Sequence, residues 1–374
     1  MIYGERIRQV RELHGWTQIE VATHVGVTQP FVAQIESGRE RAPDAFMAAY
    51  VFKTGFPLKF FETPPAMEFP LGSLLFRAKA DMTDREQKSV RTHASMAHEI
   101  LHRMLAGRSL TATQVRVPHV PNDPEHAAAI TRSELGLPPH GPIRHVLHAM
   151  ESAGVMVFGL PRSFIGGDAF SVWSLSPTGE RNPIVVMSSD RPADRVRHSA
   201  SHELGHLVMH QPLPARTDVH AEADLFAGAF LIPPEDMRQE LPSTTTLETF
   251  LQIKLKWGVS VQAAIVRAHR LGLITPRKYS SLFKSLSARG WRLHEPLSAK
   301  VPLERPRSFR QIAEMLYGKR LDFQKIADEI CYPEPFVRAL LEAHAGRDPV
   351  QEVRSESPAV RPSSAPLTFK PRIP

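Results

Sequence analysis

The 374-residue sequence contains one cysteine, Cys331, and lacks the usual marks of a secreted or membrane protein. A single cysteine excludes an intramolecular disulfide and any metal site built from several cysteines. No apolar run approaches the roughly 18 residues that cross a bilayer. Charged residues also occupy the start of the sequence, where a signal peptide requires apolar ones. We therefore expect a cytoplasmic protein with no membrane partner.

An excess of charge of one sign is also missing, since 46 Lys and Arg residues stand against 39 Asp and Glu residues, for a net charge of +7. This mild bias is compatible with nucleic-acid contact but does not by itself indicate it. Hydrophobic residues make up 42% of the chain, which excludes disorder throughout. The length suffices for two or three domains.

The succession of apolar-periodic stretches and proline-rich connections predicts a multidomain chain. An all-α N-terminal domain precedes an α+β domain and a helical C-terminal region. The expected boundaries are 1–62 for the first domain, 63–72 for a linker, 73–240 for the α+β domain, 241–295 for a helical subdomain, 296–345 for the C-terminal helical region and 346–374 for a disordered tail.

Within the α+β domain, three short β-type runs are expected to form a small sheet. They cover residues 155–158, 170–173 and 184–187. A helix to about residue 210 follows, with Ser188, Ser189 and Asp190 as its N-cap candidates. A second helix is expected over 219–232.

Residues 1–62 carry the local signals of helices joined by tight turns. Thr17 and Glu20 have the spacing of a capping box at a helix start. Gly26 lies where a turn between two helices needs a positive φ. Thr28 is expected to cap the next helix, with Pro30 in its first turn. The sequence thus predicts a helix-turn-helix.

In such a unit the second helix of the motif enters the major groove of DNA and presents polar side chains to base edges. Glutamine can pair with adenine and arginine with guanine, while a side chain at the start of the preceding helix can contact phosphate. The candidates for these contacts are Gln18, Thr28, Gln29, Gln34, Ser37 and Arg39.

The stretch from Thr17 to Gly38 resembles the XRE (Cro/C1-type) helix-turn-helix family, over about 60 residues of the chain. The resemblance implies a double-stranded DNA operator as partner. Residues 1–62 contain seven basic and seven acidic side chains, so the module lacks the usual nonspecific attraction to DNA. A protein-docking use of the same fold therefore remains the alternative.

Residues 21–32 have an internal counterpart at 326–337. Both stretches follow the order apolar-Ala-x-x-apolar, a turn, and then Pro-Phe-Val. This pattern indicates a second helix-turn-helix-like unit near the C-terminus. The alternative is two ordinary helices that share a packing pattern.

The motif His202-Glu203-Leu204-Gly205-His206 gives the strongest chemical signal. On a helix, residues four apart share a face, so both imidazoles can hold one metal with Glu203 beside it. Zinc with nitrogen ligands and one open position lowers the pKa of bound water to about 7. Glu203 can then act as the general base when that water attacks a carbonyl. The alternative is a chance match, which the helical context after a strand disfavours.

A third metal ligand is expected from the helix over 219–232. His220 lies four residues before Asp224, so His220 can bind the metal while Asp224 orients the site as a hydrogen-bond acceptor. Glu222 is the alternative ligand, but it lies about 200° around the helix from His220, so both cannot ligate without distortion. His210, one turn after His206, is interpreted as a surface or helix-end residue.

Residues 195–207, 222–227 and 230–233 together resemble the ImmA/IrrE family of zinc metallopeptidases, with further likeness at 256–264 and 271–274. The resemblance covers most of residues 70–295 and implies a zincin-like fold and a bound Zn²⁺. In that family the third ligand is a glutamate at the position of His220. This departure implies a three-histidine site, recruitment of Glu222, or weakened metal binding with loss of activity.

Taken together, the two resemblances imply a cytoplasmic bacterial transcriptional regulator that binds DNA and carries a zinc-dependent endopeptidase. Its expected substrate is an XRE-type repressor in a stress or mobile-element response, aligned by an edge strand within 170–187. The alternative is a non-proteolytic XRE-family or antitoxin-like regulator whose zinc domain is a sensor or structural unit. Whether the chain forms a homodimer stays open.

Overall fold

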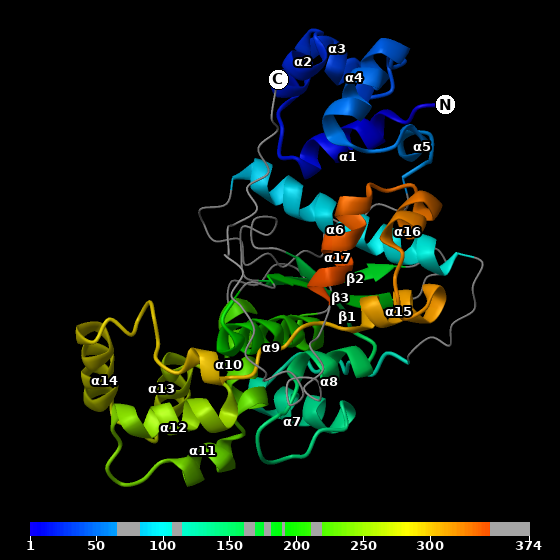
Figure 1. Cartoon of the computed structure of the whole chain (residues 1–374). Coiled ribbons are helices and arrows are strands. Elements are labelled where there is room, and N and C mark those ends of the chain that lie inside the picture. The colour runs from blue at the N-terminus through cyan, green and yellow to red at the C-terminus, as the bar shows by residue number, and fades with distance from the viewer. Residues whose placement is uncertain are drawn as a thin grey trace, which may run out of the picture.

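The computed structural model of the chain describes residues 1–65, 83–106, 114–160, 169–175, 181–188, 191–210 and 219–344 (Figure 1). Most of the expected linker, the N-cap candidates Ser189 and Asp190, and the expected disordered tail lie outside these residues. No helix in the described part of the chain is both long enough and apolar enough to cross a membrane.

Five helices form the N-terminal unit at the top of Figure 1. They are α1 (Gly4–Leu13), α2 (Gln18–Val25), α3 (Gln29–Glu36), α4 (Asp44–Thr54) and α5 (Leu58–Phe61). The all-α N-terminal fold and its helix-turn-helix, α2 and α3, are confirmed.

The turn chemistry of this unit follows the sequence with one exception. Thr17 and Glu20 form a capping box at the start of α2, and Gly26 ends it with a φ of 72°. Pro30 lies in the first turn of α3. Thr28 is the N-cap residue of α3, but its side chain makes no capping hydrogen bond, so that part of the prediction was wrong.

The middle of the chain contains a three-stranded mixed sheet of order β1-β3-β2. The strands are β1 (Met156–Leu160), β2 (Ala169–Leu175) and β3 (Arg181–Ser188). β1 pairs with β3 in parallel, and β2 pairs with β3 in antiparallel orientation. The three predicted β-runs are therefore confirmed, and β2 is an outer strand of the sheet that the described residues form.

Helices surround this sheet along the rest of the described chain. They are α6 (Asp84–Leu105), α7 (Pro124–Glu134), α8 (Val146–Ser152), α9 (Ala193–Met209), α10 (Val219–Leu231), α11 (Pro234–Glu240), α12 (Leu247–Trp257), α13 (Val261–Arg270), α14 (Pro276–Ala288), the 3₁₀ helix η3 (Ser298–Lys300), α15 (Ser308–Tyr317), α16 (Phe323–Ile330) and α17 (Glu334–Ala343).

The N-cap of α9 differs from the expected one. Its N-cap residue is Pro192, whereas Ser188 is the last residue of β3. Because Ser188 takes part in the strand ladder opposite Leu160, its backbone is extended, and the helix begins only after Pro192.

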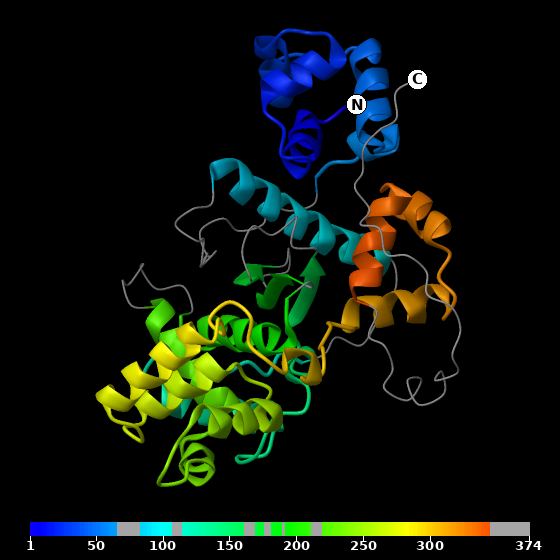
Figure 2. The same cartoon turned by 60° about the vertical axis from the view of Figure 1, so that its left-hand side comes forward.

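The sheet separates two hydrophobic cores, because alternate residues of a strand point to opposite faces. On β3, Ile184 and Val186 join a core with the N-terminal unit, α6 and α15–α17. Val185 and Met187 join a second core with α7–α10 and α12–α14. Figures 1 and 2 both show α6 on one side of the sheet and α9 on the other. The predicted domain boundaries stay predictions, since α6 shares its core with both the N-terminal unit and the sheet.

The C-terminal helices repeat the backbone of the N-terminal helix-turn-helix. α2 and α16 each have eight residues and end at a left-handed residue, Gly26 in one and Cys331 with a φ of 60° in the other. A further helix, α3 or α17, follows after the same short turn. The second helix-turn-helix-like unit suggested by the sequence is therefore present in the structure.

The surface of this second unit differs from that of a DNA reader. On α17 the exposed Arg338 is paired with two acidic side chains of the same helix, Glu334 and Glu342. The surface of this helix is therefore not an unpaired basic one that would attract DNA phosphates. The turn of this unit packs inward, with the Tyr332 ring 5.1 Å from that of Phe60. We conclude that this unit holds the N-terminal unit against the rest of the chain.

A buried ion pair connects α6 to the N-terminal unit. Arg6 of α1 is fully buried and donates to both oxygens of Glu99 on α6, at 2.7 and 2.6 Å. Arg103 contacts the same carboxylate at 2.6 Å. Arg6 also donates to the carbonyl oxygens of Thr63 and Pro64, so its donors are satisfied where α1 meets α6.

Replacing Glu99 with alanine is expected to lower the free energy of unfolding by about 3–5 kcal/mol, because two arginines lose a buried counter-ion. Urea unfolding followed by circular dichroism measures the change. The exposed Arg85–Glu20 pair also joins α6 to the N-terminal unit, so Arg85→Ala is the matched control, with an expected loss below about 1 kcal/mol. Equal losses for the two variants would show that burial of the Glu99 pair is irrelevant.

Candidate metal centre

Three histidines from two helices meet in the second core. His202 and His206 lie one turn apart on α9 and are buried, and His220 lies at the start of α10. Nε2 of His206 lies 3.1 Å from Nε2 of His202 and 3.2 Å from Nδ1 of His220. One nitrogen of each ring lies within 4.8 Å of those of the others. These are the three ligands that the sequence analysis preferred.

Gly205, inside the motif, allows α9 and α10 to approach each other. A Cβ atom at this position would lie 2.9 Å from Cδ1 of Phe226 on α10, which is closer than packed carbon atoms lie. With glycine there, the two helices pack closely. The approach carries His220 and Asp224 of α10 to the histidines of α9.

Glu203, the predicted general base, is buried and faces the sheet rather than solvent. Its Oε2 accepts a hydrogen bond of 2.7 Å from the Ser171 hydroxyl of β2. Trp173, two residues further along the same strand, donates to the carbonyl of Leu207 at 3.2 Å. β2 therefore holds both α9 and the carboxylate in place. Sequence reasoning missed Ser171, because only the pairing of β2 beside α9 gives that serine a role.

The ring nitrogens of His202 and His206 that face away from the cluster have polar partners. Nδ1 of His202 lies 2.7 Å from Oδ1 of Asp224, which places Asp224 in the orienting position expected from the sequence. Nδ1 of His206 lies 3.0 Å from Nδ1 of His210, and Nε2 of His210 lies 2.9 Å from Glu222. Such partners fix the orientation of metal-binding imidazoles.

His210 is the C-cap residue of α9, in agreement with its interpretation as a helix-end residue. Its side chain is nevertheless only 7% exposed and connects His206 to the carboxylate of Glu222, a role that the sequence analysis did not assign. Glu222, the alternative third ligand, lies against His210 and outside the histidine group. The role of His210 could have been found from the sequence, because His210 follows His206 by four residues, the same spacing that separates His202 from His206.

Burial and neighbouring imidazoles lower the pKa of His206 to about 2. Burial contributes most, followed by charge repulsion from His202, His210 and His220. The ring is thus neutral at physiological pH, which is the form that binds a metal ion. Three converging imidazole nitrogens with oriented rings fit a zinc ion that keeps one open position.

The same five-residue motif occurs a second time, as His98-Glu99-Ile100-Leu101-His102 on α6. The two imidazoles lie close, with 3.3 Å between their Nε2 atoms. Glu99, however, is held by Arg6 and Arg103 and is not available as a base. Among the described residues, no third ligand-type side chain joins His98 and His102. Of the two copies, the one on α9 is joined by a third histidine, His220.

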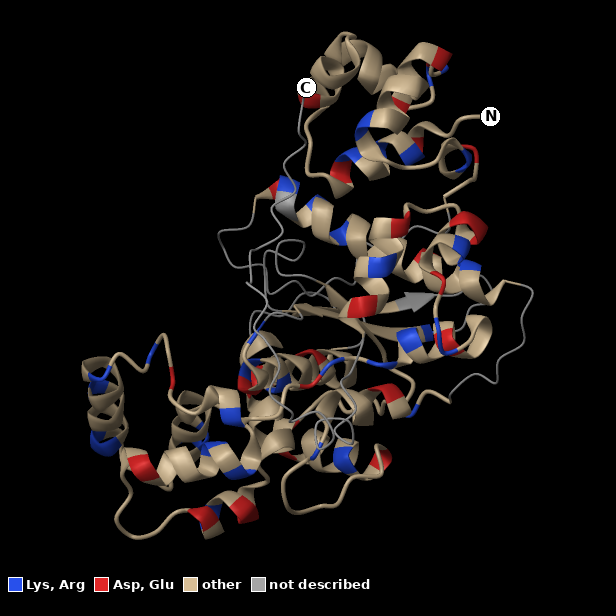
Figure 3. Cartoon of the chain, in the orientation of Figure 1, with Lys and Arg blue, Asp and Glu red and all other residues tan. Residues whose placement is uncertain are grey.

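The predicted DNA contacts lie on the N-terminal unit. Thr28, Gln29, Gln34, Ser37 and Arg39 are exposed, and Gln18 is half-buried. The amide of Gln29 donates to Gln18 at 2.8 Å, and Gln18 donates to the buried Glu36 at 2.9 Å. Gln18 therefore supports Gln29, whose oxygen and second amide hydrogen can still meet an adenine edge. Figure 3 shows both signs of charge on the N-terminal unit as a whole, in keeping with its neutral composition.

Comparison with known families matches the two halves of this description. Residues 7–49 match the family described as helix-turn-helix. Residues 150–269, which contain the sheet and the histidine cluster, match the family described as an IrrE N-terminal-like domain, a peptidase family. No curated protein matches the chain.

Purified protein is expected to contain stoichiometric zinc, measured by plasma emission spectrometry after dialysis. His202→Ala, His206→Ala or His220→Ala should each abolish zinc binding, because only two of the three imidazole ligands remain. Asp224→Asn should weaken the affinity for zinc by about 10–100-fold, because His202 loses its orienting acceptor.

The control for this experiment is His102→Ala, in the second copy of the motif on α6. This variant should keep the full zinc content. Loss of zinc in His102→Ala, or its retention in His206→Ala, would contradict the assignment of the metal centre to α9 and α10.

Proposed function

We propose that the chain is a DNA-binding transcriptional regulator that carries a zinc-dependent endopeptidase. The match of residues 7–49 to helix-turn-helix proteins supports the first part, and the match of residues 150–269 to a peptidase family supports the second. The observation that carries the proposal is the meeting of His202, His206 and His220 beside the buried Glu203.

His202, His206 and His220 are the proposed ligands, and a zinc ion held there would supply electrophilic assistance at the carbonyl of the scissile peptide bond. Glu203 accepts a proton from the attacking water and delivers it to the amine that leaves. Ser171 positions the Glu203 carboxylate through its 2.7 Å hydrogen bond. Burial of these side chains excludes bulk water and strengthens the polar interactions among them.

The outer strand β2 offers a way to hold an extended peptide. Its inner edge pairs with β3, and Ser171 on β2 contacts Glu203. A peptide that pairs with the other edge of β2 would run beside the carboxylate, with main-chain hydrogen bonds fixing its register. An XRE-type repressor in a bacterial stress or mobile-element response is the proposed substrate, acted on in the cytoplasm.

The second candidate function is a non-proteolytic or antitoxin-like regulator that uses the zinc domain as a sensor or structural unit. The position of His220, where the resembling peptidases have a glutamate, favours this alternative. A neutral imidazole in place of a carboxylate changes the ligand set and the net charge of the metal site, so the activity of the resembling peptidases does not transfer to this site by likeness alone. Metal binding is common to both functions, and proteolysis separates them.

Glu203→Gln is expected to keep its zinc and to lower cleavage of purified XRE-type repressors by about 10²–10⁴-fold, because an amide cannot accept the proton. Electrophoresis with mass spectrometry of the products measures the rate and the cleaved bond. Ser171→Ala should lower the rate by about tenfold with unchanged zinc, because the carboxylate loses its positioning hydrogen bond.

Glu235→Gln changes an exposed glutamate of α11 and should leave cleavage unchanged. Full activity in Glu203→Gln would reject the proposed role of this residue. Bound zinc together with no cleavage of any XRE-type repressor by the unmodified protein would instead favour the non-proteolytic function.

For DNA binding, Gln29→Ala or Gln34→Ala is expected to weaken affinity for an operator selected from random duplexes by about 1–3 kcal/mol, because base contacts are lost. Fluorescence anisotropy measures the affinity. The near-neutral module should also give a shallow salt dependence. Arg338→Ala, on α17 of the second helix-turn-helix-like unit, is the matched control and should bind like the unmodified protein. Equal losses in all three variants would contradict the assignment of DNA reading to α3.

A further inference from the structure

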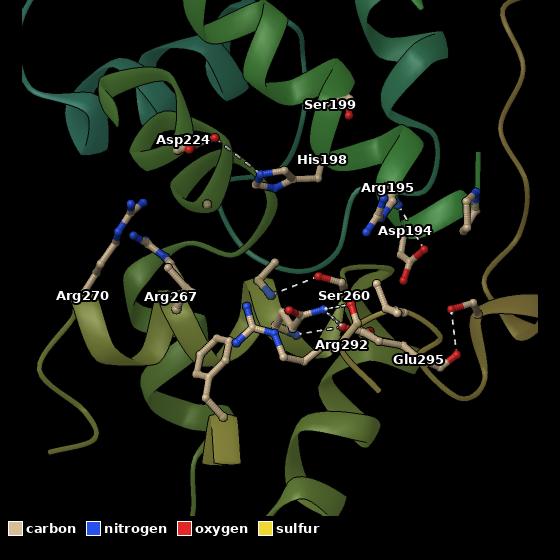
Figure 4. A pocket seen from close by; sticks show the side chains of 18 of the residues that line it. Asp194, Arg195, His198, Ser199, Asp224, Ser260, Arg267, Arg270, Arg292 and Glu295 are labelled. Atoms are coloured by element: carbon tan, nitrogen blue, oxygen red, sulfur yellow. Dashed lines mark hydrogen bonds and ion pairs between the residues drawn. The ribbon is translucent and has the colours of Figure 1, made fainter. Parts of the chain in front are cut away.

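A cavity of about 740 Å³ lies beside the metal centre (Figure 4). α9, α10, α13, α14 and the segment that follows α14 supply its walls. Its volume lies within the range of small-molecule pockets in proteins. None of the three clustered histidines lines it, so it is separate from the candidate active site.

Four arginines line this cavity, and three of them have no carboxylate partner among the described residues. Arg195, Arg270 and Arg292 line it from three different elements, and all three are exposed. In the part of the chain that the structure describes, none of the three forms an ion pair. The fourth lining arginine, Arg267, is bound to Glu125. Three guanidinium groups around one concave surface therefore remain to bind a ligand.

The three acidic groups that line the cavity are already engaged, and one of them, Asp224, lies 2.7 Å from Nδ1 of His202. Asp194 and Glu295 both contact the buried ammonium of Lys254, at 2.6 and 2.8 Å. Glu295 also accepts from the backbone N–H of Val261 at the start of α13. With these carboxylates bound, the electrostatic preference of the cavity is set by the arginines and favours an anion.

Aromatic side chains provide an apolar side to the same space. Tyr279 and Phe283 line the cavity from α14, with their ring centroids 4.7 Å apart. The guanidinium of Arg292 lies over the Phe283 ring, 5.3 Å from its centroid. A planar or apolar group can stack on these rings while an acidic group attached to it meets an arginine.

The wall between the cavity and the metal centre consists of Asp224 and His198. Asp224 lines the cavity and also holds Nδ1 of His202 at 2.7 Å. His198, one turn before His202, lies 3.7 Å from the same carboxylate. Its Nδ1 is buried and has no hydrogen-bond partner among the described residues. A ligand in the cavity would therefore lie on the Nδ1 side of His202, whereas the three histidine rings converge on its Nε2 side.

We propose that this cavity binds a small anionic molecule with an apolar or aromatic portion, and that this molecule regulates the metal centre through Asp224. The regulatory part rests on the proposed metal site, whereas the binding of an anion does not. Because the ligand adds negative charge near a divalent cation, zinc and the anion should each bind more tightly in the presence of the other.

The first experiment measures binding of three probes to the metal-free, full-length protein by isothermal titration calorimetry. Phenyl phosphate and phenylacetate carry a phosphate or a carboxylate on an aromatic ring, and benzyl alcohol is their neutral counterpart. At least one anion should bind saturably at millimolar concentrations, about tenfold or more tightly than benzyl alcohol. The stronger of the two anions identifies the acidic group that the cavity prefers.

Arg270→Ala and Arg292→Ala should each weaken that binding by about tenfold, because one charged partner is removed. Arg277→Ala is the matched control, since Arg277 is an exposed arginine of α14 that does not line the cavity. Absence of saturable anion binding, or equal effects of the three substitutions, would overturn the proposed site. Neither result depends on zinc or on proteolysis, so the proposed function is tested separately.

The second experiment measures zinc affinity against a competing chelator with and without the bound anion. We expect zinc to bind about threefold to tenfold more tightly in its presence. Arg270→Ala and Arg292→Ala should lose this effect, and Arg277→Ala should keep it. An unchanged zinc affinity would overturn the regulatory part. An effect that survives both cavity substitutions would mean that the anion ligates zinc directly, and would overturn it equally.

Discussion

The close packing of α9 against α10 is the constraint on which the candidate site depends. Helices that approach at Gly205 bring the imidazole of His220 within 3.2 Å of His206. They also bring Asp224 to the back of His202. A methyl group at this one position would force the helices apart. His220 and the carboxylate of Asp224 would then both move away from the histidines of α9. The glycine inside the motif thus shapes the site although it takes no part in the chemistry.

The sheet connects this site to the N-terminal unit. One face of β2 and β3 packs with α9, and the other packs in the same core as α1, α6 and α17. The buried pair of Arg6 and Glu99 joins α1 to α6, and the C-terminal unit contacts the aromatic side chains of α5 through Tyr332. A change in the packing of β2 therefore has a physical route to the helix-turn-helix, because rigid elements in a shared core transmit small displacements.

Local signals in the sequence predicted much of this structure correctly. The capping box of Thr17 and Glu20, the left-handed Gly26 and the three β-runs depend on neighbouring residues, and all are present. The preference for His220 over Glu222 as third ligand rested on its spacing to Asp224 and on the family position that it occupies, and the structure groups His220 with His202 and His206. Thr28 is the N-cap residue of α3 as predicted, but its side chain makes no capping hydrogen bond, because a favourable residue type does not guarantee one.

What the sequence by itself determined is the set of helices and strands, the histidine pair on one helical face and the two family likenesses, because each arises within a short stretch of chain. The tertiary structure supplied the physical reason why the α9 copy of the motif, and not the α6 copy, forms the candidate metal centre. His98 and His102 show the same spacing as His202 and His206, but arginines neutralise Glu99, while a distant serine positions Glu203. It also decided the partners of His210 and the arginine-lined cavity. These features depend on residues brought together from separate elements, and the distances between such residues cannot be predicted from the periodicity of the sequence.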